Sequence, residues 1–315
     1  MMRQLFLTLS QSRPVETTVS RVGPVRRMTR RFVAGETRGE ALHVARTLNA
    51  DGLAVALDYL GESVNDPDEA RAHAEEYVSL LKAIRAQGVN SDVSLKLTGM
   101  GLDVDEELCY QHVRRVVEVA DRHGNSVEID MEASPYVEAT LRLYKRLLRE
   151  GFRNVLVAIQ AYLYRSEHDI RDLIAIGGRV RLVKGAYAEP PGVAFPQKQD
   201  VDANFVRLMR LMLGPEARAT GFFAAIATHD EPMIRATLDY VSEQRIGPEA
   251  FEFQMIYGIR RRRQRELAAE GYTVRIYVPY GTHWYPYFMR RLAERPANLF
   301  FLLRHLVELP GRRPK

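Results

Sequence analysis

The chain has 315 residues, of which 46% are hydrophobic and 27% charged, a composition typical of a folded protein with a large buried core. Lys and Arg total 45 against 40 for Asp and Glu, so the formal net charge is +5. A single cysteine, Cys109, excludes an internal disulfide and argues against a cysteine-based metal site, and we expect no bound metal ion. No apolar run reaches the length of a membrane span, so any membrane contact is expected to be peripheral.

The first fifty residues predict an irregular helical extension. The apolar run over residues 5–9 is too short for a secretory leader, so we expect a cytoplasmic protein. Helices are predicted over Val25–Val33, which is basic, and over Arg38–Leu48. We therefore place an N-terminal helical extension at residues 1–50 and one catalytic domain at residues 51–315.

Eight short, β-rich apolar runs follow, and their spacing suits repeating βα units. The predicted strands are Leu53–Leu57, Asp92–Lys96, Ser126–Asp130, Asn154–Ile159, Val180–Val183, Gly221–Ala227, Phe251–Met255 and Val274–Val278.

Helical periodicity separates these runs. The first helix is the best marked, with Asp66 as its cap, Pro67 at its first position, Glu69 completing a capping-box pattern and Gly88 ending it. The later helices are predicted over Asp105–His123, Ser134–Glu150, Glu167–Ile176, Val201–Leu213, Pro232–Glu243, Arg261–Glu270 and Pro286–Glu294.

Continuously apolar strands separated by helices predict a parallel sheet covered by helices on both faces, and therefore an α/β protein. Eight such units predict closure into a (βα)8 TIM-like barrel. The alternative is an open doubly wound sheet, which requires a Gly-rich phosphate turn after its first strand. The segment Asp58-Tyr59-Leu60-Gly61-Glu62 is not such a turn.

Polar residues stand at or near the carboxyl end of nearly every predicted strand, where the active site of a barrel lies. Eight such ends converging on one rim favour a site over chance exposure to water. These residues are Asp58, Lys96, Asp130, Gln160, Arg181, Lys184, Thr228, His229, Asp230, Gln254 and Tyr277.

Lys96 lies in an apolar strand, so its ammonium needs a partner or a function, and Asp130 is the predicted partner. A purely structural ion pair is the alternative. Alternation places Arg181 and Val183 on one face and Lys184 on the other, unless the chain turns back at Gly185. Two cations beside a glycine suit a phosphate or an electron-rich ring, and a charged loop is the alternative.

Pro286 suits the first turn of the last helix, which is expected to place Arg290 and Arg291 near the helix start as a carboxylate or phosphate clamp. Exposed surface arginines are the alternative, against which Tyr277 and Tyr287 indicate a walled pocket. His229 has no second histidine at ligand spacing, so hydrogen bonding is favoured over metal binding.

In order and spacing, these segments resemble the proline dehydrogenase family over about residues 56–295. The matching segments are Ala56 to Glu62, Val93 to Leu97, Glu128 to Asp130, Ile159 to Tyr162, Val180 to Tyr187, Ala227 to His229, Phe253 to Gly258, Arg275 to Pro279 and Tyr287 to Arg291.

The resemblance implies a noncovalently bound FAD across the barrel mouth, with Arg181 near the reactive ring nitrogen. The implied FAD contacts are Gln160, Arg181, Val183, Lys184, Gly185, Ala186, Thr228, His229 and Asp230. It also implies that Lys96, Arg290 and Arg291 hold the proline carboxylate, and that the pocket is shaped by Asp130, Ile256, Tyr277 and Tyr287. Several relatives carry an aromatic residue where this chain has Ala188, so packing at that flavin edge is expected to differ.

The implied reaction is oxidation of L-proline to 1-pyrroline-5-carboxylate, the first step of proline catabolism to glutamate. A quinone acceptor, transient contact with the surface of the inner membrane, and a downstream pyrroline-5-carboxylate dehydrogenase follow from the same resemblance; no nucleic acid is expected. Two rivals remain open. One is a Schiff-base aldolase-type barrel using Lys96 or Lys184, and the other is an RNA-binding protein using the basic cluster at Arg260.

Overall fold

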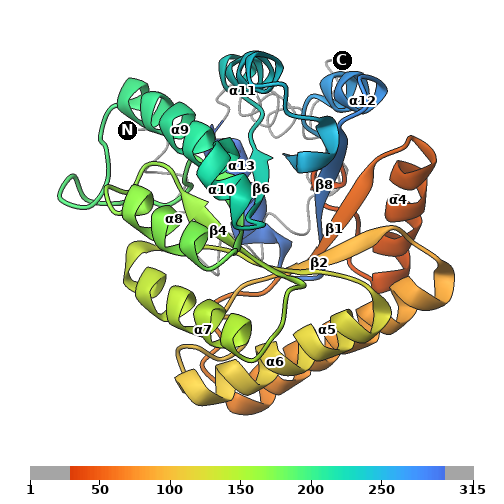
Figure 1. Ribbon diagram of the computed structural model, residues 1–315. Coiled ribbons are helices and arrows are strands. Elements are labelled where there is room, and N and C mark those ends of the chain that lie inside the picture. Colours follow the sequence, from red (N-terminus) through yellow and green to blue (C-terminus); the bar gives the residue numbers. More distant parts are fainter. Residues whose placement is uncertain (1–28, 295–315) are drawn as a thin grey trace, which may run out of the picture.

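The computed structural model describes residues 29–294, without the side chains of Arg290 and residues 292–294. Eight parallel strands pair in chain order, and β8 pairs with β1, so the sheet closes into a barrel (Figure 1). The predicted (βα)8 barrel is therefore confirmed, and the open doubly wound sheet is wrong. The domain boundary at residue 50 stays a prediction.

All eight predicted strands are present, with ends that differ from the prediction by one or two residues. They are β1 (Ala54–Tyr59), β2 (Ser91–Leu95), β3 (Val127–Ile129), β4 (Val155–Gln160), β5 (Arg179–Val183), β6 (Phe223–Ala227), β7 (Phe251–Ile256) and β8 (Thr273–Tyr280).

The predicted helices between the strands are also present. The described helices are α4 (Arg38–Ala50), α5 (Pro67–Gln87), α6 (Glu106–His123), η1 (Ser134–Tyr136), α7 (Val137–Arg149), α8 (Ser166–Ala175), α9 (Lys198–Leu213), α10 (Pro215–Ala219), α11 (Glu231–Glu243), η2 (Pro248–Ala250), α12 (Arg261–Ala269) and α13 (Trp284–Glu294). The short α10 was not predicted. Most of the helix predicted over residues 25–33 lies outside the described residues, and residues 30–32 form a turn.

Local sequence signals explain where the helices begin and end. The Asp66 carboxylate accepts hydrogen bonds from the N–H groups of Asp68 and Glu69, and Gly88 ends α5 in the left-handed conformation, as predicted. A complete capping box occurs at α4, where Thr37 and Glu40 each bond the other's backbone N–H. The sequence contains this pattern, but it was not used in the prediction.

The strands are not continuously apolar, and this expectation was wrong. In β7, buried Phe251 and Phe253 alternate with buried Glu252 and Gln254. The Gln254 side chain donates to Glu128 on β3 at 2.7 Å, and β3 and β7 are not neighbours in the barrel. This bond therefore crosses the barrel interior. One face of each such strand packs apolar side chains toward the helices, while the other fills the barrel with hydrogen-bonded polar groups.

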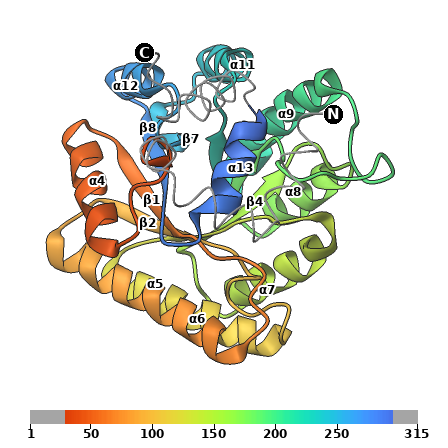
Figure 2. The ribbon, with the colours of Figure 1, turned by 180° about the vertical axis from the view of Figure 1, so that it is seen from behind.

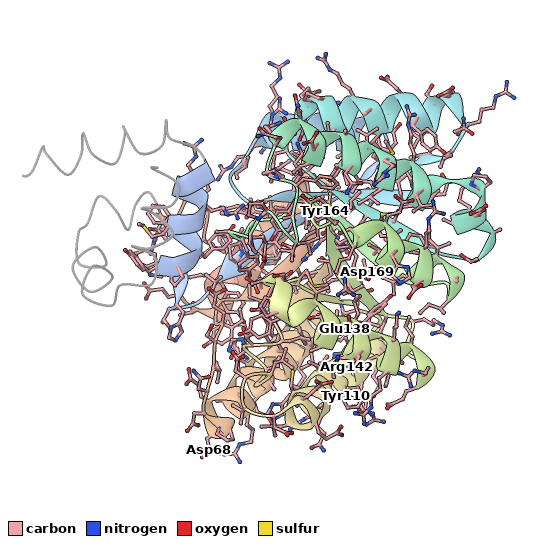
Figure 3. The ribbon with its side chains drawn as sticks, turned by 90° about the vertical axis from the view of Figure 1, so that its left-hand side faces the viewer. Asp68, Tyr110, Glu138, Arg142, Tyr164 and Asp169 are labelled. Atoms are coloured by element: carbon pink, nitrogen blue, oxygen red, sulfur yellow. The ribbon has the colours of Figure 1, made fainter. Side chains whose placement is uncertain are left out.

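The outer helices are linked to their neighbours by ion pairs. Arg142 on α7 bonds Glu106 on α6 at 2.8 Å, and Arg165 bonds Glu138 on α7 at 2.9 Å. Figure 3 shows Glu138 and Arg142 on this outer face, beside Tyr110 of α6. These side chains are largely exposed, so solvent screens each pair and its contribution to stability is small.

The first and last described helices are placed differently around the barrel. Helix α4 packs against β1 and β8, on the outside of the barrel. Helix α13 instead contributes Tyr287 and Arg291 to a cavity that also contains strand-end residues such as Lys96. Figure 2 shows α13 in front of the strands, away from the outer ring formed by α5 to α8. The last βα unit therefore supplies a cover for the barrel mouth.

Candidate active site

A cavity of about 510 Å³ lies at the carboxyl ends of the strands, the size of a small-molecule site. It brings together every predicted site residue except Arg290, whose side chain lies outside the described residues. Its lining includes Lys96, Asp130, Gln160, Arg181, Val183, Lys184, Gly185, Ala186, Thr228, His229, Asp230, Ile256, Tyr277, Tyr287 and Arg291. The roles assigned to these residues stay predictions.

Lys96 stands at the centre of a buried polar cluster. Its Nζ lies 3.0 Å from the Asp130 carboxylate, the predicted partner, and 3.4 Å from the Asp58 carboxylate. It also lies 3.2 Å from the hydroxyl oxygen of Tyr277, which accepts from Lys96 and donates to Asp130 Oδ2 at 2.9 Å. The ammonium is thus fixed by three groups from three strands.

Arg181 lies inside the barrel and bonds two carboxylates. Its Nη1 donates to Glu128 and its Nη2 donates to Asp130, so one guanidinium joins two carboxylates of β3 and its following residue. Ser94 Oγ also donates to Asp130, at 2.8 Å. Among the described residues, the buried Nε of Arg181 has no hydrogen-bond partner. These contacts fix the orientation of the Arg181 guanidinium.

Burial and pairing shift the pKa values of these groups in opposite directions. Burial alone would raise the pKa of Asp130, but Lys96 and Arg181 together hold it well below the ordinary value. Burial raises the pKa of Glu128 to about 7, against the opposing effect of Arg181 and Arg275. Burial would lower the pKa of Lys96, but Asp58 and Asp130 raise it well above normal. Lys96 is therefore a cation at any physiological pH.

Lys184 faces the same cavity as Arg181, as expected if the chain turns back at Gly185. The strand ends at Val183, and Gly185 takes a φ of +116°, which lets the chain turn as the alternative reading proposed. A Cβ at Gly185 would lie 2.4 Å from the Tyr162 ring. Lys184 Nζ bonds Asp202 and, at 2.5 Å, Asp230.

His229 has a hydrogen-bonding role within the protein. Its Nε2 accepts the backbone N–H of Ile256 at 2.7 Å, so the ring proton of the neutral tautomer is on Nδ1. Gln160 is also oriented by a hydrogen bond within the protein: its side-chain Nε2 donates to the backbone carbonyl of Glu132 at 3.0 Å. Both side chains are held in place before any ligand arrives.

Helix α13 corrects the expected position of the arginine pair. The helix begins at Trp284, so Arg290 and Arg291 lie about two turns inside it, and Arg291 falls in its last described turn. The positive end of the helix dipole therefore does not assist an anion at Arg291. The Arg291 guanidinium lies 5.4 Å from the Tyr287 ring centre, and both residues line the cavity.

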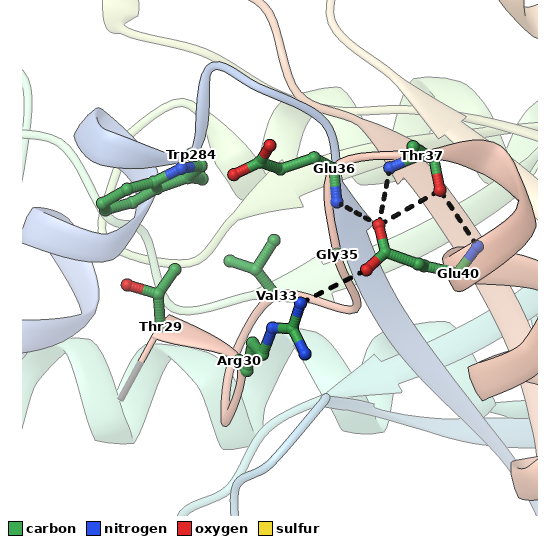
Figure 4. A pocket seen from close by; sticks show the side chains of 8 residues that line it. All are labelled: Thr29, Arg30, Val33, Gly35, Glu36, Thr37, Glu40 and Trp284. Carbon is green, nitrogen blue, oxygen red and sulfur yellow. Dashed lines mark hydrogen bonds and ion pairs between the residues drawn. The ribbon is translucent and has the colours of Figure 1, made fainter. Parts of the chain in front are cut away.

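A second, smaller cavity of about 200 Å³ lies between the N-terminal described segment and α13 (Figure 4). Glu40 accepts the N–H groups of Glu36 and Thr37 here and pairs with Arg30 at 3.5 Å. None of the predicted site residues line it.

Two residues of the main site were missed. Asp58 was noted only as a strand end, yet its carboxylate is a partner of Lys96. Glu128 was quoted only within a matching segment, yet it holds Arg181 and Gln254. The sequence offered the same signal for both residues. A carboxylate inside a short apolar strand must be paired, for the same reason as the ammonium of Lys96.

Comparison with known proteins identifies close relatives over nearly the whole chain. The model of the family described as proline dehydrogenase matches residues 41–304. Proline dehydrogenase 1 of Bacillus subtilis (strain 168) is 45% identical over 308 residues, covering 98% of this chain and 100% of that protein. Proline dehydrogenase of Deinococcus radiodurans is 39% identical over 310 residues, covering 97% of this chain and 98% of that protein.

The fold is also similar to a solved structure. Proline utilization A (PutA) from Bdellovibrio bacteriovorus, inactivated by N-propargylglycine, matches with a TM-score of 0.80 and 26% identity. The match covers 87% of this chain and 33% of that one, so the chain corresponds to about a third of that longer protein. Within residues 29–294, no helix combines the length and apolar character needed to cross a membrane.

Proposed function

Because this chain belongs to the proline dehydrogenase family, we propose that it oxidises L-proline to 1-pyrroline-5-carboxylate with a noncovalently bound FAD. The observation that carries the proposal is one cavity shared by Lys96, which directly follows β2, Arg181 of β5 and Arg291 of α13. A zwitterionic amino acid with a small apolar ring matches a cavity that combines fixed cations with aromatic walls.

The lining residues fit a flavin. The buried Nε of Arg181 has no partner among the described residues and is available to an electron-rich ring or ring nitrogen. Gly185 lines the cavity, and its backbone packs so closely against the Tyr162 ring that no side chain fits at this position. Lys184 and the Nδ1–H of His229 supply a cation and a donor nearby. The proposed FAD contacts are Gln160, Arg181, Val183, Lys184, Gly185, Ala186, Thr228, His229 and Asp230.

The proposed substrate site adjoins these residues. Lys96 and Arg291, with Arg290, bind the proline carboxylate, and the rings of Tyr277 and Tyr287 enclose the substrate ring together with Ile256. Asp130 orients Lys96 and Tyr277 rather than taking a proton, because its pKa is held low by Lys96 and Arg181 despite burial. Proline loses its amine proton to solvent as the zwitterion binds, so no side chain is required as a strong base.

When bound, the flavin supplies the two-electron acceptor for oxidation of the carbon next to nitrogen. The protein contributes orientation and electrostatics: its charged groups are already paired and need little rearrangement when the substrate arrives. We propose further that the electrons leave to a quinone during transient contact with the surface of the inner membrane. The product then passes to a pyrroline-5-carboxylate dehydrogenase, in the first step of proline catabolism to glutamate, in the cytoplasm.

The Schiff-base alternative is disfavoured by the environment of both lysines. A nucleophilic lysine needs a lowered pKa, whereas Lys96 lies between two carboxylates that raise it. Lys184 is paired with Asp202 and Asp230.

The RNA-binding alternative is disfavoured by pairing in the basic cluster. Arg260 bonds Glu231 at 2.9 Å, Arg262 bonds Glu266 at 2.6 Å, and Arg263 bonds Glu270 at 3.0 Å. Much of the positive charge of this cluster is therefore neutralised locally.

The decisive experiment is anaerobic titration of the purified protein with L-proline. We expect a yellow preparation whose flavin absorbance bleaches on addition of L-proline, and transfer of the electrons to an added quinone. A colourless protein that forms a borohydride-trapped adduct with a carbonyl substrate, or a flavin that L-proline leaves oxidised, contradicts the proposal.

A further inference from the structure

A buried hydrogen-bonded chain joins the loops that follow β1, β2 and β3. The backbone N–H of Ser63 donates to Thr98 Oγ1 at 3.0 Å, and the Thr98 hydroxyl donates to Glu132 Oε2 at 2.6 Å. The Thr98 N–H donates to the other oxygen, Glu132 Oε1, at 3.0 Å. Thr98 and Glu132 are 1% and 5% exposed, so water does not compete for these bonds.

The direction of each bond in the chain is fixed by its members. An amide N–H only donates, so the Thr98 oxygen accepts from Ser63 and its single hydrogen points to Glu132. Both oxygens of Glu132 therefore accept hydrogen bonds from Thr98. An ionised carboxylate satisfies this arrangement, whereas a protonated one brings a competing donor to an oxygen that already accepts.

This chain lies immediately next to the proposed substrate site. Thr98 follows Lys96 by two residues, and Glu132 follows Asp130 by two residues. At the other end, Ser63 follows Glu62, whose carboxylate is one of the groups, after Asp58 and Asp130, that raise the pKa of Lys96. A contact that fixes the position of Ser63 therefore also fixes the loop that carries the Glu62 carboxylate near Lys96.

Ser63 needs such support, because its φ of 58° lies in the left-handed region that non-glycine residues seldom adopt. A conformation of this kind persists only where the surroundings enforce it. Three hydrogen bonds help to do so: Ser63 N–H donates to the Thr98 hydroxyl, Val64 N–H donates to the Thr98 carbonyl at 3.1 Å, and the Asn65 side-chain amide donates to the Ser63 carbonyl at 3.2 Å.

We propose that Thr98 and Glu132 are positioning residues for proline binding, which hold the loop over residues 60–65 beside Lys96 through the N–H of Ser63. The inference rests on the proposed function, since it concerns the affinity for the same substrate. It assigns no direct contact with proline to either residue.

The titration of Glu132 makes this positioning depend on pH. Burial raises the pKa of Glu132 to about 7, although the two hydrogen bonds from Thr98 and the charge of Lys96 oppose the rise. The other titratable groups that face it are Glu62 on the β1 loop, Cys109 on α6 and Tyr136 in η1. The hydrogen-bonded chain is therefore complete above about pH 7 and weakened below it.

The test compares Thr98→Val with Thr98→Ser as the matched control, because serine keeps the hydroxyl and valine keeps the shape. KM and kcat for proline are measured from pH 6 to 8.5 on flavin-loaded enzyme. We expect the ratio of KM in Thr98→Val to that of the wild type to be smaller at pH 6, where the wild-type chain is weakened, than at pH 8. The ratio should rise to roughly tenfold at pH 8, the effect of one lost hydrogen bond. Changes in kcat should stay small, and Thr98→Ser should follow the wild type.

A second variant, Glu132→Gln, places an amide donor against Thr98 and should raise KM at pH 8 to a similar extent. Equal KM values in all proteins, a pH-independent KM ratio, or a Thr98→Ser variant as impaired as Thr98→Val would overturn the inference. Circular dichroism shows whether each variant is folded.

Hydrogen exchange separates this inference from the proposed function. The amides of residues 61–65 should exchange faster in Thr98→Val than in Thr98→Ser at pH 8, whether or not the protein oxidises proline. Unchanged exchange in this segment contradicts the positioning role. Absence of proline oxidation in the wild type contradicts the proposed function alone.

Discussion

Arg181 on β5 donates through Nη1 to the carboxylate of Glu128 on β3, and both side chains are almost completely buried inside the barrel. The same carboxylate accepts from Gln254 at 2.7 Å, so Glu128 on β3 is bonded to side chains of both β5 and β7. Its neighbours include further carboxylates, Glu252 and Asp92, which help to raise its pKa. The Arg181 guanidinium is thus bonded to the carboxyl group of Glu128, whose pKa is raised to about 7.

Replacement Glu128→Gln should remove a pH-dependent part of the stability. Burial raises the pKa of Glu128 from 4.5 to about 7, so the folded state favours the protonated form. The stabilisation from this group is present at low pH and is lost as the pH rises through about 7. The wild type should therefore lose about 2–3 kcal/mol relative to Glu128→Gln between pH 5 and 8.5. Urea unfolding at both pH values measures the difference, and a difference that does not vary with pH would contradict this assignment.

Replacement Lys96→Met should lower kcat/KM for proline by roughly a hundredfold or more. The change leaves the Asp58 and Asp130 carboxylates buried without the ammonium that lies between them, a loss of about 3 kcal/mol or more. It also removes one of the cations proposed to bind the substrate carboxylate. Steady-state kinetics measure the effect, with Lys82→Met on the exposed face of α5 as the control. Wild-type kinetics in Lys96→Met would remove Lys96 from the site.

Replacement Arg291→Ala should raise KM for proline by roughly ten- to a hundredfold, while the flavin stays bound. Arg291 lines the cavity beside Tyr287 and is proposed to bind the proline carboxylate in ground state and transition state alike, so kcat should change little. The same expectation applies to Arg290. Kinetics and the flavin absorbance of the purified protein are the measurements, with exposed Arg85→Ala as the control. Unchanged KM in both variants would remove the carboxylate assignment.

Replacement Gly185→Ala should weaken flavin retention and lower thermal stability. The added Cβ would lie 2.4 Å from the Tyr162 ring, and the φ of +116° is unfavourable for alanine. Such strain costs about 1–3 kcal/mol and shifts Lys184, which follows the end of β5. Gly192→Ala, in the same loop, is the matched control, because its Cβ meets no atom within 4 Å. Equal melting temperatures and equal flavin content in the two variants would show that the close approach at Gly185 is unimportant.

The elements of the fold were predictable because their signals are local. Apolar β-rich runs, the Asp66 cap and the Gly88 stop depend on residues near one another in the chain, and the structure contains each of them. The gathering of cationic strand ends at one rim was also predictable, since a barrel places all its strand ends there.

The alternation within the strands was the main error. The run Phe251–Met255 is predicted as an apolar strand with Gln254 near its end, but Glu252 and Gln254 both lie on its inward face. The interior of this barrel is charged and hydrogen-bonded, whereas apolar side chains usually fill such a core. Composition over a short window does not reveal which face carries the charge.

The sequence by itself therefore determined the eight βα units, their closure and the kinds of residue that meet at the mouth. Only the tertiary structure decided that Lys96 pairs with Asp58 and Arg181 with Glu128, and that Thr98 links the Ser63 N–H to Glu132 by hydrogen bonds. It also decided that α13 covers the mouth rather than joining the outer ring. The physical reason is that closure of the barrel brings together residues as distant as Glu128 and Gln254, 126 positions apart, and no local periodicity specifies such a pair.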